Sequence, residues 1–405
     1  MNQKPHVLIA GAGIGGLALA LALIQRGFPV TVFEQASELR EFGAGINLTP
    51  NGYRVIDQLG IADAVREQGC IPTARQIRHW QSGKIWPFID VGPEAIQRWG
   101  YTSMTVYRPD LHQPLIDAVE RARPGTIHLQ HRVAGFDQDE EGVRVNLADG
   151  RTFKGDLLVG ADGVHSPIRQ GLFGADRPEF TGVVAWRGVI PMKRLPPHLA
   201  EVISNVWVGP GRHSVQYPLR AGNVMNFVGL VERDDWLVES WTERGTHEEW
   251  ARDFAGWHED IHTFIRAVDV PFKWALMSRT PMSRWSIGRV TLLGDACHPM
   301  LPFLAQGAAQ SMEDALVLAR VLDRYAVGAK HTELEQALVR YEDLRRDRTA
   351  RAVLGSAANA KRFHHPDLGN LATAEAYIER EFAPAPLIER YDWLFSYDAM
   401  KVVID

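Results

Sequence analysis

The stretch LIAGAGIGGLALALALIQRGFPVTVFE, residues 8–34, decides the fold of the amino-terminal part of the chain. An apolar run leads into a cluster of glycines, a longer apolar segment follows, and the stretch closes on an alternating apolar run. This order predicts a strand over 6–10, a helix over 14–26 and a strand over 30–34. Two parallel strands joined by a helix form a βαβ unit, so we expect a parallel sheet here.

The glycines of this stretch have the spacing of a dinucleotide-binding turn. They form G-x-G-x-x-G between the first strand and the helix, and Glu34 ends the second strand. Such glycines let backbone N–H groups at the positive end of the helix approach a pyrophosphate, and the acidic residue accepts a ribose hydroxyl. A carboxylate there favours FAD or NAD over NADP. We predict one dinucleotide site with contacts at Gly11, Gly13, Ile14, Gly15, Gly16 and Glu34.

Composition excludes several classes of function. The 405 residues are 45% hydrophobic and 23% charged, with a net charge of −5, which is typical of a globular protein with two or three domains. This charge balance predicts neither a nucleic-acid nor a membrane partner. The two cysteines, Cys70 and Cys297, lack metal-ligand spacing and favour a reducing, cytoplasmic compartment without a metal site. Cys297 and His298 are interpreted as loop packing. Residues 7–24 are uncharged and long enough to span a bilayer, but the glycines favour the βαβ interpretation.

Later segments predict a second domain. Residues 180–275 are mostly β-like and rich in aromatic residues, and the chain then returns to a buried strand and long helices. We therefore expect an α/β fold, with a Rossmann-like FAD-binding domain interrupted by a β-sheet-rich substrate domain and followed by C-terminal helices. The expected boundaries are 1–71, 101–178 and 276–355 for the FAD-binding domain, 72–100 and 179–275 for the substrate domain, and 356–405 for the helical tail.

Three further segments carry a family resemblance. GADGVHSPIR at 160–169, LLGDACHPMLPFLAQGAAQSMEDA at 292–315 and YRPDLH at 107–112 occur in the order and spacing typical of the FAD-dependent aromatic hydroxylases. The chain, over about residues 5–355, thus resembles the para-hydroxybenzoate hydroxylase-like class A flavoprotein monooxygenases. It looks closest to 3-hydroxybenzoate 6-hydroxylase and 6-hydroxynicotinate 3-monooxygenase. The resemblance implies that NADH or NADPH reduces a non-covalent FAD, and that a C4a-hydroperoxyflavin transfers oxygen to an electron-rich ring.

The same segments supply further candidate FAD contacts. Asp295 follows a buried strand at its carboxyl end, where ligands of open α/β sheets bind, although it can equally be a turn residue. Gly307 and Ala308 open the next helix, and their N–H groups can stabilise negative charge. The resemblance implies FAD contacts for Arg108 and Asp162. A surface arginine and a structural turn are the alternatives.

The hairpin strand RHSVQYP contains the candidate catalytic residues. His213, Val215 and Tyr217 share one strand face. A phenol with a pKa near 10 needs a base at neutral pH, and histidine titrates in a suitable range. The resemblance implies that His213 deprotonates the substrate and that Tyr217 orients it. A hydrogen-bonded core histidine is the alternative.

The remaining substrate contacts are less well defined. We predict contacts at Asn47, Trp207, Val215 and Pro302, and core packing or turn formation is the alternative for each. Trp186 is a further possible pocket wall, while Arg187 and Arg212 can meet a carboxylate or lie at the surface. Asn47 and Pro302 differ from the residues of both enzymes named above, and Ala305 replaces a glycine usual in the family. These departures leave the substrate's identity open.

The expected function is an NAD(P)H-dependent FAD monooxygenase, with NADH favoured over NADPH. It would hydroxylate, with or without loss of a carboxylate, a small hydroxylated aromatic or N-heteroaromatic carboxylic acid, using O₂, and a homodimer is expected as a possible assembly. The alternatives are hydroxylation of urate or of a larger apolar ring, an FAD-linked oxidase or reductase without oxygen transfer, and a flavin-binding interaction protein without turnover.

Overall fold

The computed structural model describes residues 4–39, 44–235, 243–329 and 331–405. A five-stranded sheet in the order β17-β11-β1-β2-β7 forms the first layer, and its neighbouring strands are all parallel. Its strands are β1 (Val7–Ala10), β2 (Val30–Phe33), β7 (Ile127–His128), β11 (Leu157–Gly160) and β17 (Val290–Leu292). With α1 (Ile14–Gln25) between β1 and β2, the predicted βαβ unit is confirmed.

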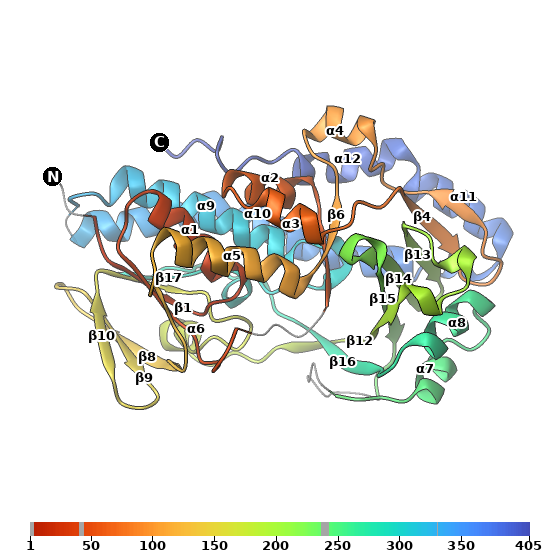
Figure 1. Ribbon diagram of the computed structural model, residues 1–405, viewed down its shortest axis with the longest axis horizontal. Coiled ribbons are helices and arrows are strands. Elements are labelled where there is room, and N and C mark those ends of the chain that lie inside the picture. Colours follow the sequence, from red (N-terminus) through yellow and green to blue (C-terminus); the bar gives the residue numbers. More distant parts are fainter. Residues whose placement is uncertain (1–3, 40–43, 236–242, 330) are drawn as a thin grey trace.

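Helix α1 is the centre of this layer. It packs between α5 (Arg108–Ala122) and α9 (Gly307–Tyr325), as Figure 1 shows. Ten of its twelve residues are buried, as expected for a helix that is apolar on all sides. The uncharged run at 7–24 is therefore a strand, a turn and a core helix. None of the helices in the described residues combines the length and apolar character that crossing a membrane requires.

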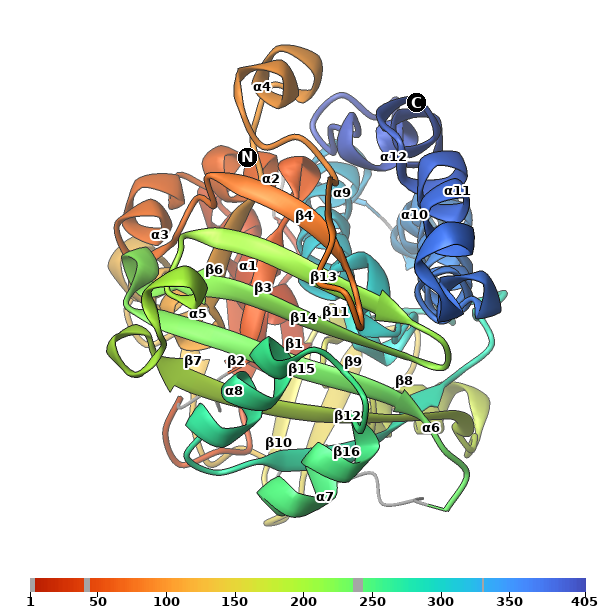
Figure 2. The same cartoon turned by 90° about the vertical axis from the view of Figure 1, so that its right-hand side faces the viewer.

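A seven-stranded sheet forms the second layer, in the order β16-β12-β15-β14-β13-β4-β5. Helices α7 (His247–Asp253) and α8 (Glu259–Ala267) cover one face, which we call the outer face, and they stand in front of the sheet in Figure 2. The opposite, inner face packs against the C-terminal helices. The strands are β4 (Ala74–His79), β5 (Ile85–Pro87), β12 (Glu179–Pro191), β13 (Ile203–Gly209), β14 (Arg212–Leu219), β15 (Val224–Glu232) and β16 (Phe272–Ser278).

Shorter elements connect the two layers. The strands β3 (Gly45–Leu48) and β6 (Met104–Tyr107) pair with each other, and β8 (Val133–Gln138), β9 (Val143–Leu147) and β10 (Thr152–Gly155) form a small sheet. The short helices are α2 (Pro50–Gln58), α3 (Ala62–Gln68), α4 (Pro93–Trp99) and α6 (Pro167–Phe173). Six 3₁₀ turns complete the described elements: η1 (Met192–Arg194), η2 (Pro197–Leu199), η3 (Arg220–Gly222), η4 (Gly294–Ala296), η5 (Pro302–Leu304) and η6 (Pro366–Gly369).

The C-terminal helices are continuous with the first layer. Helix α10 (His331–Phe363) packs along α9 and runs across the domain boundary expected at 355/356, so the tail does not begin there as a new element. Helices α11 (Leu371–Phe382) and α12 (Pro384–Phe395) follow it over the inner face. The end of the chain returns to the first layer, where Gln58 donates to Asp398 Oδ1 at 2.8 Å and Arg320 donates to the Val402 carbonyl at 2.9 Å.

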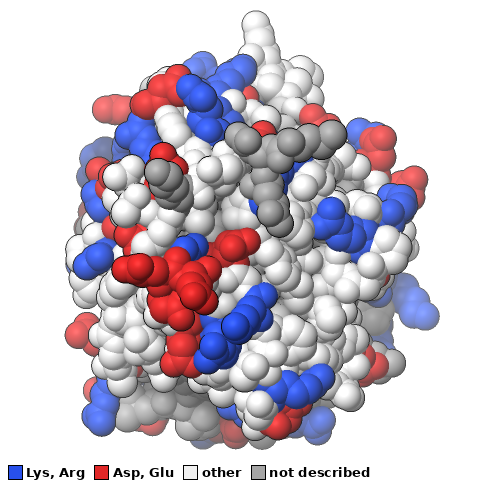
Figure 3. Space-filling model, turned by 90° about the vertical axis from the view of Figure 1, so that its left-hand side faces the viewer, with Lys and Arg blue, Asp and Glu red and all other residues white. Residues whose placement is uncertain are grey.

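One face of the molecule carries side chains of both charges. On the face shown in Figure 3, basic and acidic side chains lie side by side in small groups. Interspersed charges of this kind do not create the one-sided positive field with which proteins bind nucleic acids.

Candidate active site

The predicted cofactor contacts converge on one edge of the parallel sheet. Gly11 follows β1, Glu34 follows β2, Asp162 follows β11 and Asp295 lies in η4 just after β17. Parallel strands end at the same edge, so four segments far apart in the sequence meet at the carboxyl ends of the strands.

Three glycines of the turn have no room for a side chain, and a fourth is open. A Cβ on Gly11, whose φ is +102°, would lie 2.4 Å from the Ala161 carbonyl oxygen, and one on Gly16 would lie 2.1 Å from the Gly11 carbonyl oxygen. A Cβ on Gly15 would meet Leu293 and Ser311 side chains. A Cβ on Gly13 would have no atom within 4 Å. The backbone is thus bare at the start of α1, where a pyrophosphate can approach.

Two carboxylates stand beside this turn. Glu34 accepts hydrogen bonds from the Ala12 N–H at 3.0 Å and the Ala36 N–H at 2.9 Å, which fix its carboxylate next to the glycine turn. The Asp295 side chain is exposed and forms no hydrogen bond within the described residues. Ile14, at the first position of α1, is only 6% exposed and packs inward.

The turn after β11 contains an unsatisfied acceptor. Asp162 Oδ2 accepts from the Ile168 N–H at 3.2 Å, while its Oδ1 is buried without a hydrogen-bond partner. Burial raises the pKa of this carboxyl group. A buried acceptor without a partner is costly, and a ligand group that donates to it would remove this cost. Arg108 begins α5 next to the same edge, and its N–H donates to the Ala44 carbonyl at 2.9 Å.

Helix α9 presents its amino-terminus to the site. Gly307 and Ala308 are its first residues, both are partly exposed, and a Cβ on Gly307 would meet no atom within 4 Å. The preceding Gln306 does not cap the helix, because its side chain donates to Thr49 Oγ1 at 2.8 Å and accepts from Asn51 at 2.9 Å. The first N–H groups of the helix therefore stay available to negative charge. The bare glycines, the orphaned Asp162 oxygen and these N–H groups together fit a bound FAD.

A buried ionic cluster supports this helix from below. The Arg345 side chain is 0% exposed. Its Nη1 lies 2.8 Å from Glu313 Oε2, and its Nε lies 2.7 Å from Asp314 Oδ1. Burial acts to raise the pKa of Glu313, but Arg348 and Arg345 outweigh it and the pKa is lowered. The carboxylates are therefore ionised and neutralised by arginine, which anchors α9 to α10.

Cys297 and His298, in the loop that follows η4, lie close to Asp314 of α9. Sequence reasoning found the first two but missed Asp314, which is contributed by α9. The Asp314 carboxylate already accepts from His298 at 2.5 Å, from Arg345 and from the Gly294 N–H at 3.1 Å. Burial raises the pKa of the Cys297 thiol well above its usual range. With its carboxylate neutralised and its thiol protonated, the cluster is suited to holding the loop in place.

His213 lies on the inner face of the seven-stranded sheet and begins a hydrogen-bonded series. It is 1% exposed, and its Nδ1 lies 2.6 Å from Nε2 of His364, at the end of α10. His364 Nδ1 in turn lies 2.7 Å from Oε1 of Glu232, whose side chain is 54% exposed. The Phe303 ring, on η5, is 5.3 Å from the imidazole. The series thus connects a buried imidazole to a carboxylate that reaches solvent.

Tyr217 joins the inner face to strand β3. Its hydroxyl donates to the Gly45 carbonyl at 2.8 Å, and Asn226 Oδ1 accepts from the Gly45 N–H at 3.2 Å. Two residues along β3, the buried Oδ1 of Asn47 has no hydrogen-bond partner. Burial raises the pKa of Tyr217, against the opposing effect of Arg75. The phenol therefore stays protonated and can donate a hydrogen bond.

The structure brings Val215 to this site but not Trp207. Val215 is partly exposed although it lies in a central strand, as are its neighbours Val206 and Val228, so protein does not fully cover this part of the inner face. Trp207 is opposite Ser214 and 1% exposed, and it packs on the outer face with Trp186. Neither tryptophan lines the face that carries His213, which corrects the expectation of aromatic pocket walls.

The loop after η4 places two more predicted positions. Pro302 is exposed at the start of η5, and it precedes Phe303, whose ring packs against the His213 imidazole. Ala305 has a φ of +54°, the left-handed conformation for which the usual glycine is suited. Arg187 lies on the inner face, with its guanidinium over the rings of Phe272 and Trp274. Arg212 pairs with Gly209 and Val231, which places it on the outer face of the sheet.

Sequence reasoning missed three residues near this site. His364 and Glu232 complete the series that begins at His213, and Arg75 of β4 lies on the inner face with an electrostatic contact to Tyr217. In the sequence, Arg75 stands out only as a charged residue within an alternating strand. The pairing of β4 with β13 was needed to place it near Tyr217. His364 gave no usable signal, because 151 residues separate it from His213.

Comparisons with known proteins agree with this geometry. A family profile described as an FAD binding domain matches residues 4–356. The chain is 38% identical to the 6-hydroxynicotinate 3-monooxygenase of Pseudomonas fluorescens, over 99% of this chain and 97% of that enzyme. It is 35% identical to the 3-amino-4-hydroxybenzoate 2-monooxygenase of Streptomyces platensis, over 99% of this chain and 98% of that enzyme. It is also 35% identical to the 3-hydroxybenzoate 6-hydroxylase of Polaromonas naphthalenivorans, over 98% of each.

A solved structure resembles the whole chain. Klebsiella pneumoniae HpxO, complexed with FAD and uric acid, superimposes with a TM-score of 0.83 at 30% identity, covering 96% of both chains.

Proposed function

The chain belongs to the family of FAD-dependent aromatic-ring monooxygenases, and from this premise we propose that it hydroxylates a small aromatic or N-heteroaromatic carboxylic acid that already carries a hydroxyl group. The relatives named after 6-hydroxynicotinate, 3-hydroxybenzoate and 3-amino-4-hydroxybenzoate all act on acids of this kind by their names. NADH is the proposed reductant and O₂ the oxidant. Oxygen is added with or without loss of the carboxylate.

FAD would be held along the carboxyl edge of the parallel sheet. The start of α1 receives the pyrophosphate, Glu34 the ribose, Asp295 the polyol chain, and the N–H groups of Gly307 and Ala308 the electron-rich edge of the ring. When bound and reduced, the flavin supplies the activation of O₂ and the transfer of one oxygen atom. The protein supplies orientation, exclusion of water and control of protons.

His213 is the proposed base because of its hydrogen bonds and its neutrality. The hydrogen bond from His364 lowers the pKa of Glu232, so this carboxylate is ionised and can only accept. His364 therefore carries its proton on Nδ1, and its Nε2 accepts the Nδ1 proton of His213. This leaves a lone pair on His213 Nε2. Burial lowers the pKa of His213 well below its usual value and keeps the ring neutral.

Proton removal then follows the series. The phenolic O–H bond of the substrate breaks as an N–H bond forms at His213 Nε2. The Nδ1 proton of His213 passes to Nε2 of His364, and the Nδ1 proton of His364 passes to Glu232 and from there to water. The phenolate that results is a better ring nucleophile than the phenol. The half-exposed Glu232 returns the net proton to solvent.

Substrate orientation is assigned to the residues around this lone pair. The Tyr217 hydroxyl donates its only proton to the Gly45 carbonyl, so its oxygen is left to accept a hydrogen bond from the substrate. Asn47 offers an unsatisfied amide oxygen, and the partly exposed Val215 offers an apolar wall for the ring. Pro302, at the start of η5, is proposed as a further substrate contact because the next residue, Phe303, packs against His213.

The His213–His364–Glu232 series carries this proposal, because ring hydroxylation is favoured by a buried base that ionises the phenol and passes the proton to solvent. The test uses purified FAD-loaded protein with NADH or NADPH and each of four compounds: 6-hydroxynicotinate, 3-hydroxybenzoate, 3-amino-4-hydroxybenzoate and uric acid. Product is identified by mass spectrometry and separated from peroxide. The proposal expects a hydroxylated product, formed in proportion to NADH oxidised, from at least one of the three acids. Turnover of uric acid alone, or peroxide alone, would contradict it.

Cellular location and assembly belong to the same proposal. Cys70 and Cys297 are both free and buried, which supports a reducing, cytoplasmic setting. A homodimer is proposed as the assembly, and size-exclusion chromatography with light scattering measures it directly.

A further inference from the structure

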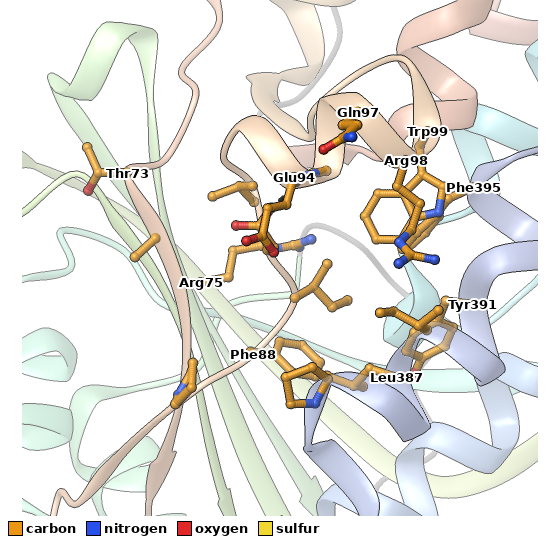
Figure 4. A pocket seen from close by; sticks show the side chains of 18 residues that line it. Thr73, Arg75, Phe88, Glu94, Gln97, Arg98, Trp99, Leu387, Tyr391 and Phe395 are labelled. Carbon is orange, nitrogen blue, oxygen red and sulfur yellow. Dashed lines mark hydrogen bonds between the residues drawn. The ribbon is translucent and has the colours of Figure 1, made fainter.

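A cavity of about 700 Å³ lies beside the inner face of the seven-stranded sheet. Strands β4 and β5 and helix α4 form one side of it, and helix α12 forms the other. Figure 4 shows Trp99 and Phe395 at one end and Phe88 and Leu387 below. Small-molecule sites are commonly concave, have this size, and combine apolar and aromatic walls with a few polar groups.

Arg75 is the charged group that enters this cavity. It extends from β4 toward the middle of the cavity in Figure 4 and remains partly exposed. Burial lowers the pKa of Arg75 to about 10, so its guanidinium stays protonated at neutral pH. No carboxylate among the described residues forms an ion pair or hydrogen bond with it, and its electrostatic neighbours are the hydroxyls of Tyr217 and Tyr391. Buried charges are normally paired.

Other charged groups line the cavity without neutralising Arg75. The Asp90 carboxylate is already bound to the N–H groups of Gly92 at 3.1 Å and Ala95 at 2.7 Å, where α4 begins. Glu94 and Arg98 are both exposed on α4. The partly buried guanidinium of Arg75 therefore remains available to an anion that brings an apolar body with it.

The cavity is next to the proposed reaction site but separate from it. Its lining includes none of the proposed FAD contacts and neither His213 nor Tyr217. Arg75 pairs with Ser204 on β13, and Asn205 pairs with Gln216, so Arg75, Ser204 and Tyr217 stand in one row across the sheet. A ligand held by Arg75 in this cavity thus lies at the β4 end of that row, two strands away from Tyr217.

We propose that this cavity binds an aromatic carboxylate at a site apart from the ring-hydroxylation site, with Arg75 as the partner of the carboxylate group. The choice of an aromatic acid as ligand rests on the proposed function. The apolar wall of Phe88, Trp99 and Leu387 receives the ring, and the guanidinium receives the two carboxylate oxygens. The site captures the acid next to the place where it reacts.

The test measures binding without turnover. FAD-loaded protein is titrated with 4-fluorobenzoate and with 4-fluorobenzamide, which lack a ring hydroxyl, and binding is followed by ¹⁹F NMR. We expect 4-fluorobenzoate to bind, 4-fluorobenzamide to bind at least about 10-fold more weakly, and Arg75→Gln to weaken only the carboxylate by about 10- to 100-fold. Arg98→Gln, an exposed arginine of the same cavity, is the matched control and should change affinity less than about 2-fold.

Two further variants keep the test decisive. Arg75→Lys retains the charge and should restore part of the affinity if Arg75→Gln disturbs folding. Val215→Phe fills the reaction site, and carboxylate binding that depends on Arg75 should persist in it. Equal binding of 4-fluorobenzoate to wild type and Arg75→Gln, or loss of all binding in folded Val215→Phe, would overturn the inference. Binding through Arg75 with no hydroxylation of any acid would instead refute the proposed function alone.

Discussion

Replacing His364 separates two consequences of the hydrogen-bonded series. In His364→Phe the Nδ1–H of His213 loses its acceptor within the buried site. Keeping the reactive tautomer then means burying an unpaired N–H, which costs about 1–3 kcal/mol. The other tautomer carries its proton on Nε2 and cannot accept one from the substrate. The population of competent base should therefore fall by roughly 5- to 150-fold.

The glutamine variant provides the matched comparison. In His364→Gln the amide oxygen can accept from His213 Nδ1–H while the amide nitrogen donates to Glu232, so the reactive tautomer is retained. An amide does not pass protons along, however. We expect the His364→Gln variant to keep His213 as a competent base but to release the proton to solvent more slowly. It should lose less activity at neutral pH than the His364→Phe variant. His198→Gln, whose side chain is 64% exposed, serves as the control outside the series.

The assay is product formation as a function of pH, normalised to bound FAD. Because the pKa of His213 is lowered well below 6.5, the wild-type base stays neutral, and its rate should be flat from pH 6.5 to 9. In His364→Phe the rate should rise with pH by up to about tenfold per unit, since the substrate must ionise in water. A His364→Phe variant with the wild-type rate and a flat pH profile would refute this assignment of the base.

Three predictions concern the framework of the site. Gly16→Ala should abolish folding or FAD binding, because its Cβ would lie 2.1 Å from a backbone oxygen, whereas Gly13→Ala should fold and lose only FAD affinity, as circular dichroism and flavin absorbance would show. Ala305→Gly should stabilise the protein by about 0.5–1 kcal/mol in thermal denaturation, because it relieves a left-handed φ; a lower melting temperature would contradict this. Arg345→Met should destabilise by about 3–5 kcal/mol in urea, since the buried carboxylates of Glu313 and Asp314 each lose one of their cationic partners, and the partly exposed Arg346→Met should change stability by under about 0.5 kcal/mol.

The cofactor edge could be predicted from sequence because its determinants are local. Gly11 to Gly16, Glu34 and Asp295 each follow a strand, and the carboxyl ends of parallel strands meet without further information. The shared face of His213, Val215 and Tyr217 likewise follows from the strand period. The series to His364, by contrast, depends on where a 33-residue helix ends against the sheet.

Trp207 shows how register limits such predictions. Odd-numbered residues of β14 face inward, but Val208 pairs with His213, so it is the even-numbered residues of β13 that share this face. The two-residue turn between the strands reverses the parity, and Trp207 faces α7 and α8 instead. To place Arg75 on this face, a second strand pairing must be known, because β4 pairs in parallel with β13 from a distant part of the chain.

The central claim is that this chain inserts an oxygen atom from O₂ into a hydroxylated aromatic acid. The direct measurement is turnover of FAD-loaded protein with NADH under ¹⁸O₂, using 6-hydroxynicotinate, 3-hydroxybenzoate and 3-amino-4-hydroxybenzoate, with the product analysed by mass spectrometry. The account predicts a ring-hydroxylated product that contains one ¹⁸O atom. A product without ¹⁸O, or oxidation of NADH that yields only labelled peroxide with every acid, would contradict it.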